Sequence, residues 1–253
     1  VRTDCRYFIG DRPCEWGGAC EGCERYSPAG TRILIIKLAA AGDVLRTASI
    51  LPPLRRKYER SHVTWVTDPS AMPLLSRNPH IDRLLPFGFE SWLVLSVQDF
   101  DLLICLDKEP RACAMASSLR ADTRLGFGMS GEGAVVPMNE GARYDYELGL
   151  SNELKFHGNT ASFPEIFCRT AELDYQGEPY ELVVPDESIA YAREFFDRLS
   201  ASEPVVGLNV GAGRVFANKA WTAEGYATLA KAIRDDLGGT AVTEDYGSHD
   251  TPV

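Results

Sequence analysis

Thr31-Arg-Ile-Leu-Ile-Ile-Lys-Leu-Ala-Ala-Ala-Gly-Asp-Val-Leu-Arg46 is the stretch of this chain that decides its fold. The continuous apolar run 33–38 is typical of a parallel strand buried on both faces. A turn of small residues, Ala39–Gly42, follows and allows a ligand to approach the backbone closely. Asp43 then stands near the N-terminus of the next helix. The glycines of a dinucleotide fingerprint and the lysine–hydroxyl pair of a P-loop are both missing. The stretch therefore predicts a strand–loop–helix site that presents a carboxylate and a lysine, Lys37.

Strand and helix patterns alternate from residue 31 to about residue 130. Such alternation implies an α/β fold with a parallel sheet covered by helices on both faces. Ligands of these sheets bind at the carboxyl ends of the strands, which is where Asp43 falls. We expect strands over 33–38, 63–67, 83–86, 102–106, 124–127 and 205–210, and at most one more after residue 238. We expect helices over 44–58, 70–77, 110–119, 144–154, 164–173, 187–199 and 223–237.

The bulk properties narrow the class of protein. With 253 residues, the chain is long enough for one large or two ordinary domains, and 45% hydrophobic and 25% charged residues are typical of a soluble globular protein. A formal net charge of −10 argues against a nucleic-acid-binding protein, which would normally carry a stripe of basic residues. We find neither a window of 18 apolar residues nor a signal-peptide pattern, and we expect a cytoplasmic protein.

Two motifs in the right order carry a resemblance to a known family. The first is Lys37 followed by Gly42-Asp-Val-Leu45. The second is Val205-Val-Gly-Leu-Asn-Val-Gly-Ala-Gly213, followed by Asn218-Lys-Ala-Trp221. Asn152-Glu-Leu-Lys155 and Phe163-Pro-Glu-Ile166 add a weaker match between them. From about residue 31 to residue 235 the chain resembles the glycosyltransferase family 9 heptosyltransferases of lipopolysaccharide assembly.

The resemblance implies a fold of the GT-B type, built from two Rossmann-like domains. Residues 31–180 would be the N-terminal, acceptor-side domain. Residues 181–253 would be the start of the C-terminal, donor-side domain, which we expect to be incomplete because the family's Asp-x-Gly-Pro-x-His motif is missing. Residues 1–30 form a cysteine-rich extension that the core family does not require.

The activity that the resemblance implies is an inverting glycosyl transfer. A heptose-like sugar would move from a nucleotide-diphosphate donor, similar to ADP-heptose, to a lipopolysaccharide-core or related glycan acceptor. Such a transfer needs a base for the acceptor hydroxyl, and the resemblance implies Asp43 for this role. A helix-capping aspartate is the alternative from the residues alone. A non-catalytic acceptor-binding or interaction module is the alternative function, and an oxidoreductase is disfavoured because the dinucleotide fingerprint is incomplete.

The other site residues divide between donor and acceptor. The resemblance implies that Lys219 contacts the donor diphosphate, and the Gly211-Ala212-Gly213 loop could offer backbone amides to the same phosphates. A plain strand-to-helix turn is the alternative for this loop. Lys37, Gly42 and Arg111 are the acceptor-side candidates, with a solvated surface lysine as the alternative for Lys37. An acceptor of this kind fits a peripheral association with the cytoplasmic face of the inner membrane.

The cysteine-rich extension is the second sharp feature of the sequence. Cys5, Cys14, Cys20 and Cys23 are spaced C-x8-C-x5-C-x2-C. In a cytoplasmic protein this pattern favours a four-thiolate site, with structural zinc as the metal. An iron–sulfur cluster, free thiols and two disulfides are the alternatives. Glycosyl transfer itself is expected to require no cofactor. Cys105, Cys113 and Cys168 fit small buried hydrophobic positions.

Overall fold

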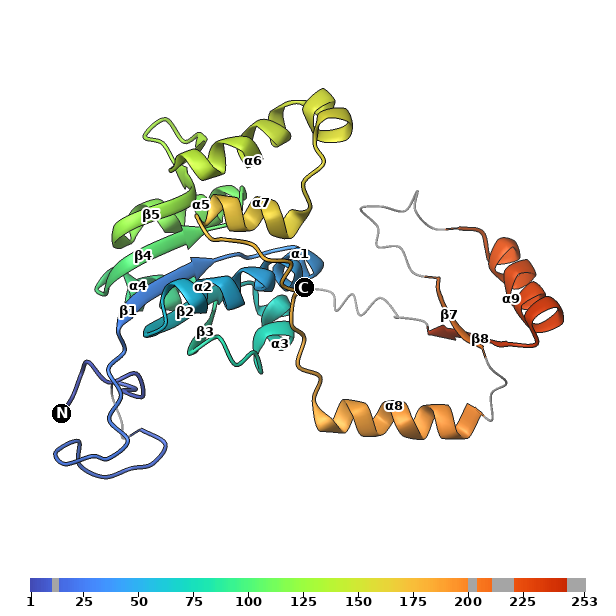
Figure 1. Cartoon of the computed structure of the whole chain (residues 1–253), viewed down its shortest axis with the longest axis horizontal. Helices are drawn as coiled ribbons and strands as arrows, with labels where there is room; N and C mark the ends of the chain where they lie inside the picture. The colour runs from blue at the N-terminus through green and yellow to red at the C-terminus, as the bar shows by residue number, and fades with distance from the viewer. Residues whose placement is uncertain (11–13, 200–203, 211–220, 245–253) are drawn as a thin grey trace. The chain divides into compact units, whose positions relative to one another are not determined.

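A computed structural model describes residues 1–10, 14–199, 204–210 and 221–244 of the chain (Figure 1). The chain divides into two compact units, Val1–Val183 and Val184–Val253, and each unit is described by itself. Among the described residues, the first unit contains a six-stranded sheet and the second a two-stranded sheet.

The large sheet of the first unit has the strand order β3-β2-β1-β4-β5-β6 (Figure 1). Neighbouring strands from β3 to β5 are parallel, and β6 is antiparallel to β5. The apolar run of the opening motif forms the central strand β1, and Ile33 to Ile36 have no exposed surface. The predicted α/β class and parallel sheet are confirmed. The strands span Thr31–Ile36 (β1), Ser61–Thr67 (β2), Arg83–Pro86 (β3), Asp99–Cys105 (β4), Arg120–Met129 (β5) and Val135–Pro137 (β6).

Helices cover both faces of this sheet. On one face Val44 of α1, Leu54 of α2 and Phe167 of α7 pack in one cluster with Ile33 and Ile35. On the other face, residues of α4 and α5 pack against the opposite side of β1. No helix in the described part of the chain combines the length and apolar character needed to cross a membrane. The helices span Ala41–Thr47 (α1), Leu51–Lys57 (α2), Met72–Leu75 (α3), Phe89–Ser96 (α4), Pro110–Ser118 (α5), Glu140–Leu150 (α6) and Phe163–Thr170 (α7), with 3₁₀ turns at Ala48–Ile50 and Pro69–Ala71 and a π-helical turn at Leu154–Gly158.

The sequence pattern does not predict α4 or β6. α4 reads Phe-Glu-Ser-Trp-Leu-Val-Leu-Ser. Its apolar residues lie on both the exposed and the buried side of the helix, since Phe89 and Leu93 are exposed while Leu95 is buried. The sequence therefore shows no single apolar face. β6 has three residues and is too short to show alternation. β1 also ends at Ile36 instead of Leu38, although the N–H of Lys37 still donates to the carbonyl of Val66 at 3.1 Å.

The second unit has its own strand–helix–strand arrangement. β7 (Val205–Asn209) and β8 (Thr240–Glu244) are parallel, and α9 (Ala223–Leu237) lies between them in the sequence. The side chain of Thr222 caps α9, and Gly238 ends it with a left-handed φ of 63°. α8 (Asp186–Leu199) precedes β7. This arrangement fits the start of a second Rossmann-like domain.

The N-terminal extension forms no helix or ladder strand in its described residues, only an isolated bridge between Cys5 and Pro28. An ion pair between Arg6 and Asp82, just before β3, connects the extension to the rest of the unit. Asp82 also accepts hydrogen bonds from Arg55 and from the N–H of Val63, each at 2.7 Å. Burial opposes the charge of Asp82, but these donors together hold the pKa of its carboxyl below the usual value.

Gly126 of β5 is a position that only glycine fits. Its φ is +88°, and a Cβ there would overlap the backbone carbonyl of Cys105 on β4. A non-glycine residue in a sparsely populated backbone region costs about 1–3 kcal/mol before any such overlap. We expect Gly126→Ala to lower the free energy of unfolding by about 2–3 kcal/mol in urea denaturation. Gly131→Ala is the control, since its Cβ would meet no atom within 4 Å. Equal stability of the two variants would contradict the prediction.

Candidate functional site

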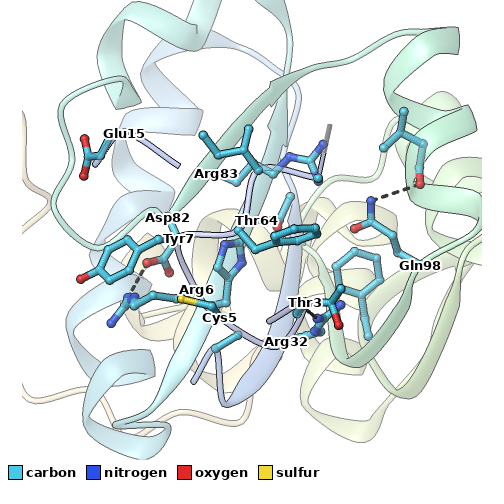
Figure 2. A pocket seen from close by; sticks show the side chains of 17 residues that line it. Thr3, Cys5, Arg6, Tyr7, Glu15, Arg32, Thr64, Asp82, Arg83 and Gln98 are labelled. Atoms are coloured by element: carbon cyan, nitrogen blue, oxygen red, sulfur yellow. Dashed lines mark hydrogen bonds and ion pairs between the residues drawn. The ribbon is translucent and has the colours of Figure 1, made fainter. Parts of the chain in front are cut away.

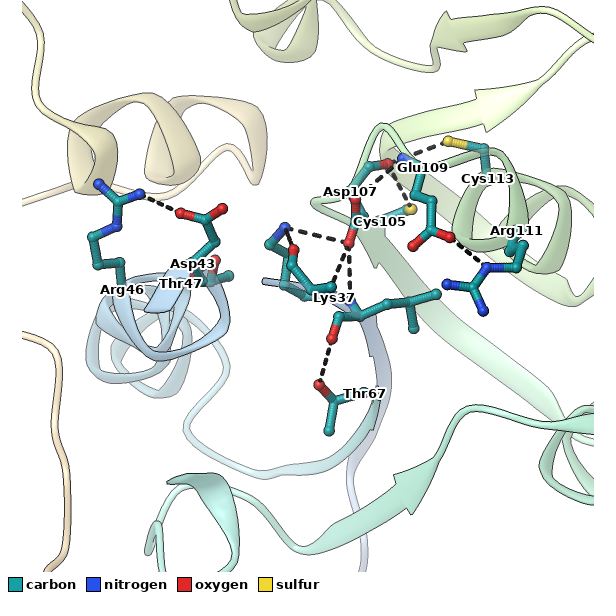
Figure 3. Close-up of polar contacts among 12 residues, drawn as sticks. Lys37, Asp43, Arg46, Thr47, Thr67, Cys105, Asp107, Glu109, Arg111 and Cys113 are labelled. Carbon is teal, nitrogen blue, oxygen red and sulfur yellow. Dashed lines mark hydrogen bonds and ion pairs between the residues drawn. The ribbon is translucent and has the colours of Figure 1, made fainter. Parts of the chain in front are cut away.

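The carboxyl ends of β1 and β4 meet at one edge of the large sheet, where polar side chains gather (Figure 3). The two strands are parallel neighbours, with Ile36 opposite Cys105. Lys37 and the turn to Asp43 follow β1, while Asp107 and Arg111 follow β4. The fold therefore brings the predicted residues Lys37, Asp43 and Arg111 to one edge of the sheet, as expected for ligand sites in such sheets.

Lys37 forms a buried ion pair with Asp107. Its Nζ lies 3.3 Å from Asp107 Oδ2 and donates to the carbonyl of Ala39 at 2.5 Å. The two side chains are 7% and 10% exposed, so the alternative of a solvated surface lysine is wrong. Asp107 Oδ2 also accepts from the N–H groups of Leu38 at 3.0 Å and Ala39 at 3.3 Å. The pair thus fixes the turn that leads from β1 to Asp43.

Asp43 lies in the first turn of α1 and does not cap the helix. Ala40 is the N-cap residue, and no side chain makes a capping hydrogen bond there. The side chain of Asp43 is 39% exposed and forms an ion pair with Arg46. The Arg46 guanidinium lies 4.0 Å from the ring centroid of Phe163 on α7, a cation–π contact that holds it in place. The capping alternative is therefore wrong, and Asp43 keeps a partly exposed carboxylate with a fixed cationic partner.

The turn around Gly42 is open to an approaching molecule. A Cβ at Gly42 would meet no atom of this chain within 4 Å, so packing gives no reason for glycine at this position. Arg111 lies in the first turn of α5, and its guanidinium is 56% exposed. It pairs with Glu109, which raises its pKa, and lies 5.2 Å from the ring centroid of Phe87. Contacts of Gly42 and Arg111 with an acceptor stay predictions.

Comparison with known proteins finds a heptosyltransferase relative and solved glycosyltransferase structures that are similar to this chain. No family model matches the chain. A curated relative, the lipopolysaccharide core heptosyltransferase OpsX of Haemophilus influenzae, is 24% identical over 216 residues, which are 81% of this chain and 57% of that protein. The chain therefore spans a little over half the length of this curated relative. A glycosyl transferase family 9 structure from Veillonella parvula is similar with a TM-score of 0.62 and 20% identity, over 84% of this chain and 62% of that one.

Two E. coli structures are similar as well. ADP-heptose lps heptosyltransferase II has a TM-score of 0.56 and 21% identity, over 84% of this chain and 64% of that one. Heptosyltransferase WaaC with ADP-2-deoxy-2-fluoro heptose has a TM-score of 0.53 and 18% identity, over 87% of this chain and 70% of that one.

The chain has the glycosyltransferase family 9 fold. The predicted resemblance to this family is confirmed in sequence and in fold.

The donor-side motif that carries the resemblance lies mostly outside the described residues. Gly211, Ala212, Gly213 and Lys219 all fall in the range 211–220. Trp221 is described and exposed, and its ring makes an edge-on contact with Tyr226, with 5.4 Å between the ring centroids. The hydroxyl of Tyr226 donates to the carbonyl of Asn209 at 2.8 Å, which ties α9 to the end of β7. The phosphate-binding roles of the motif stay predictions.

The predicted metal site at the extension is not assembled in the structure. Cys5, Cys14, Cys20 and Cys23 are free thiols, so the alternative of two disulfides is not seen either. Nowhere in the described residues do three or more histidine, cysteine, aspartate or glutamate side chains form a group that could hold a metal ion. Zinc at these four cysteines stays a prediction from their spacing.

Thiol labelling tests the zinc prediction. Cys105, Cys113 and Cys168 are buried, and burial raises the pKa of Cys168 to about 12. Only the four cysteines of the extension should therefore react quickly with a thiol reagent at neutral pH in the metal-free chain. If the zinc prediction is correct, adding zinc should slow all four by at least about tenfold, because bound thiolates are shielded. Unchanged labelling rates with zinc would contradict it.

The three cations at the C-terminal end of α2 make contacts within the first unit. Arg55 donates to Asp82, and Arg56 pairs with Glu178 at 2.7 Å. Lys57 donates to the carbonyl of Glu172 at 2.8 Å. Arg56 and Lys57 thus hold the segment that follows α7, and Arg55 holds the turn before β3, so all three are poorly placed to recognise an acceptor.

Asp107 and Arg46 are the site residues that sequence reasoning missed. Asp107 directly follows the apolar run of β4, as Lys37 follows β1. This parallel placement is the signal that could have paired them, because adjacent parallel strands end at the same edge. Arg46 stands three residues after Asp43, a spacing that brings side chains together on a helix.

Proposed function

We propose that this chain is part of an inverting glycosyltransferase that moves a heptose-like sugar from a nucleotide-diphosphate donor to a lipopolysaccharide-core or related acceptor. The observation that carries the proposal is Asp43, a partly exposed carboxylate that does not cap its helix and lies at the carboxyl edge of the large sheet. The similarity to a lipopolysaccharide core heptosyltransferase supports the choice of sugar and acceptor. The chain would meet such an acceptor at the cytoplasmic face of the inner membrane.

Asp43 would act as the general base. Its carboxylate takes the proton of the acceptor hydroxyl as that oxygen attacks the anomeric carbon from the face opposite the leaving group. The new C–O bond forms while the bond to the diphosphate breaks, and the diphosphate leaves with the electron pair. Attack from the opposite face inverts the anomeric configuration. Arg46 would hold the Asp43 carboxylate in position, since its own guanidinium is fixed on Phe163.

The departing diphosphate requires a positive site. We propose Lys219 and the amides of Gly211, Ala212 and Gly213 for this role, as the family motif implies. Asp99 and Asp101 have the Asp-x-Asp spacing of a divalent-ion chelate. They lie at the amino end of β4, where Asp99 pairs with Arg120 and Asp101 accepts from the N–H of Arg32. Because Asp43 lies at the opposite edge of the sheet, we propose a transfer that does not use these carboxylates.

Donor binding tests the proposal. We would titrate ADP and ADP-heptose into this chain by calorimetry, together with Asp43→Ala and Lys219→Ala. The expected result is saturable binding that Lys219→Ala weakens by at least about tenfold and Asp43→Ala leaves unchanged, because the base contacts the acceptor and the lysine contacts the diphosphate. Binding that does not respond to Lys219→Ala would contradict the donor assignment. Absence of binding to the parent chain would favour an acceptor-binding module instead.

A further inference from the structure

A cavity in the first unit lies away from the candidate site. It has a volume of about 1100 Å³ and is formed between the N-terminal extension and the amino ends of the strands (Figure 2). Asp43 lies near the carboxyl ends of the same parallel strands, so the cavity is at the opposite edge of the sheet. Sites of about 300–1,000 Å³ commonly hold a small molecule, and this volume is ample for one.

Three basic side chains from adjacent strands line this cavity on one face of the sheet. Arg32 of β1 is the register partner of His62 of β2, and Thr64 of β2 is the partner of Arg83 of β3. His62 and Thr64 are two residues apart and therefore share a face. The wall thus presents a row of two guanidiniums and an imidazole, which the regular register of a parallel sheet holds in fixed order.

These basic groups have few counter-charges in the described structure. Asp82 also lines the cavity, but Arg6, Arg55 and the N–H of Val63 already use its carboxylate. Among the described residues Arg83 has no ion pair or hydrogen bond through its guanidinium, and burial alone lowers its pKa. Within the described residues the guanidinium of Arg32 makes one long hydrogen bond, of 3.4 Å, to the carbonyl of Thr3.

The other residues that line the cavity indicate which kind of anion would fit it. Burial lowers the pKa of His62 and so favours the neutral imidazole, which can donate one hydrogen bond and accept another. Glu15 is the other carboxylate of the wall. Tyr7, Phe100 and Val94 supply apolar surface on the other sides. Two guanidiniums beside an apolar wall match a doubly charged phosphate attached to a ring or an alkyl group.

We propose that this cavity binds a phosphomonoester, with Arg83 and Arg32 on the phosphate and the organic part against Tyr7 and Phe100. Because Tyr7 and Thr3 belong to the extension, a bound phosphomonoester contacts both the extension and the sheet. The ligand therefore fastens residues 1–30 to the domain. The site is independent of the proposed transferase activity, since none of its residues is used there.

Phenyl phosphate is a suitable probe, since it joins a phosphate dianion to an aromatic ring. We expect saturable binding in calorimetry, weakened at least tenfold by Arg83→Gln and less by Arg83→Lys, which keeps the charge. Arg120→Gln is the matched control because Arg120 is an exposed arginine of the same edge outside the cavity, and it should bind as the parent does. Lys219→Gln should also bind as the parent does, which separates this site from the donor site.

A second readout follows the extension itself. Phenyl phosphate should slow tryptic cleavage within residues 1–30 of the parent and leave the cleavage of Arg83→Gln unchanged. Benzoate, which carries a carboxylate in place of the phosphate, tests whether the site requires the phosphate dianion. We expect it to bind at least fivefold more weakly than phenyl phosphate. Lack of saturable binding to the parent, or equal binding by Arg83→Gln, would overturn the proposal. Thermal melting checks that Arg83→Gln is folded, and no loss is expected because the guanidinium of Arg83 makes no ion pair or hydrogen bond within the described part of the chain.

Discussion

Asp43→Asn is expected to lower kcat of the full-length protein by about 10²–10⁴-fold, because an amide cannot take the proton of the acceptor hydroxyl. The substitution keeps the size of the side chain, and Ala40, not Asp43, begins the helix, so no cap is lost. KM for the donor should stay within about threefold, since the base contacts the acceptor and not the diphosphate. Release of the nucleoside diphosphate in the presence of donor and acceptor measures the rate.

Glu140→Gln is a matched control for this prediction. Glu140 also lies in the first turn of a helix and pairs with an arginine three residues later, Arg143, as Asp43 pairs with Arg46. If loss of such a surface pair were the whole effect, both variants would lose activity to the same small extent. We expect Glu140→Gln to be as active as the parent. A kcat for Asp43→Asn within threefold of the parent would rule out Asp43 as the base.

Asp107→Leu is expected to lower the free energy of unfolding by about 3–5 kcal/mol, because it leaves a buried ammonium without its counter-ion. The N–H groups of Leu38, Ala39 and Glu109 would lose their carboxylate acceptor as well. Lys37→Met should cost less, since Asp107 then keeps these three N–H donors. The order of the two losses, measured by urea denaturation, is therefore part of the prediction.

The double variant Lys37→Met/Asp107→Leu tests whether the loss of stability in Asp107→Leu comes from the buried charge that is left without a partner. Replacing both charges by apolar groups removes the unpaired charge, so the double variant should be more stable than Asp107→Leu alone. Asp99→Asn is the surface control, because its pair with Arg120 joins side chains that are 85% and 57% exposed and should contribute less than about 1 kcal/mol. Equal, small losses at Asp107 and Asp99 would contradict the assigned role of the buried pair.

Much of the fold could be predicted from local pattern. The run from Ile33 to Ile36 is apolar at every position because β1 is central and covered on both faces, and such a run is visible in the sequence. The strands over 63–67 and 102–106 are predicted for the same reason, since β2 and β4 are largely buried, while those over 83–86 and 124–127 are predicted from shorter apolar stretches. α4 is not visible in this way, because its exposed Phe89, Leu93 and Val94 hide the boundary between its inner and outer faces.

The candidate site could be predicted only in part. Asp43 follows from the strand–turn–helix pattern, since a carboxylate after a buried strand lies at the ligand edge in most such sheets. The burial of Lys37 depends on Asp107, which is 70 residues away in the sequence. That contact arises from the pairing of β1 with β4, which skips β2 and β3 and is not encoded in any local pattern. The position of Phe163 under Arg46 depends likewise on where α7 packs.

The two sheets differ in how their outer strands are protected against pairing with another molecule. The large sheet ends in β3 and β6, which are short and contain Pro86 and Pro137, and a proline has no N–H to offer to a neighbouring strand. β7 and β8 contain no proline, and among the described residues each pairs only with the other. A two-stranded sheet is marginal by itself. The protection that prolines give to the outer strands of the large sheet therefore has no counterpart in β7 and β8.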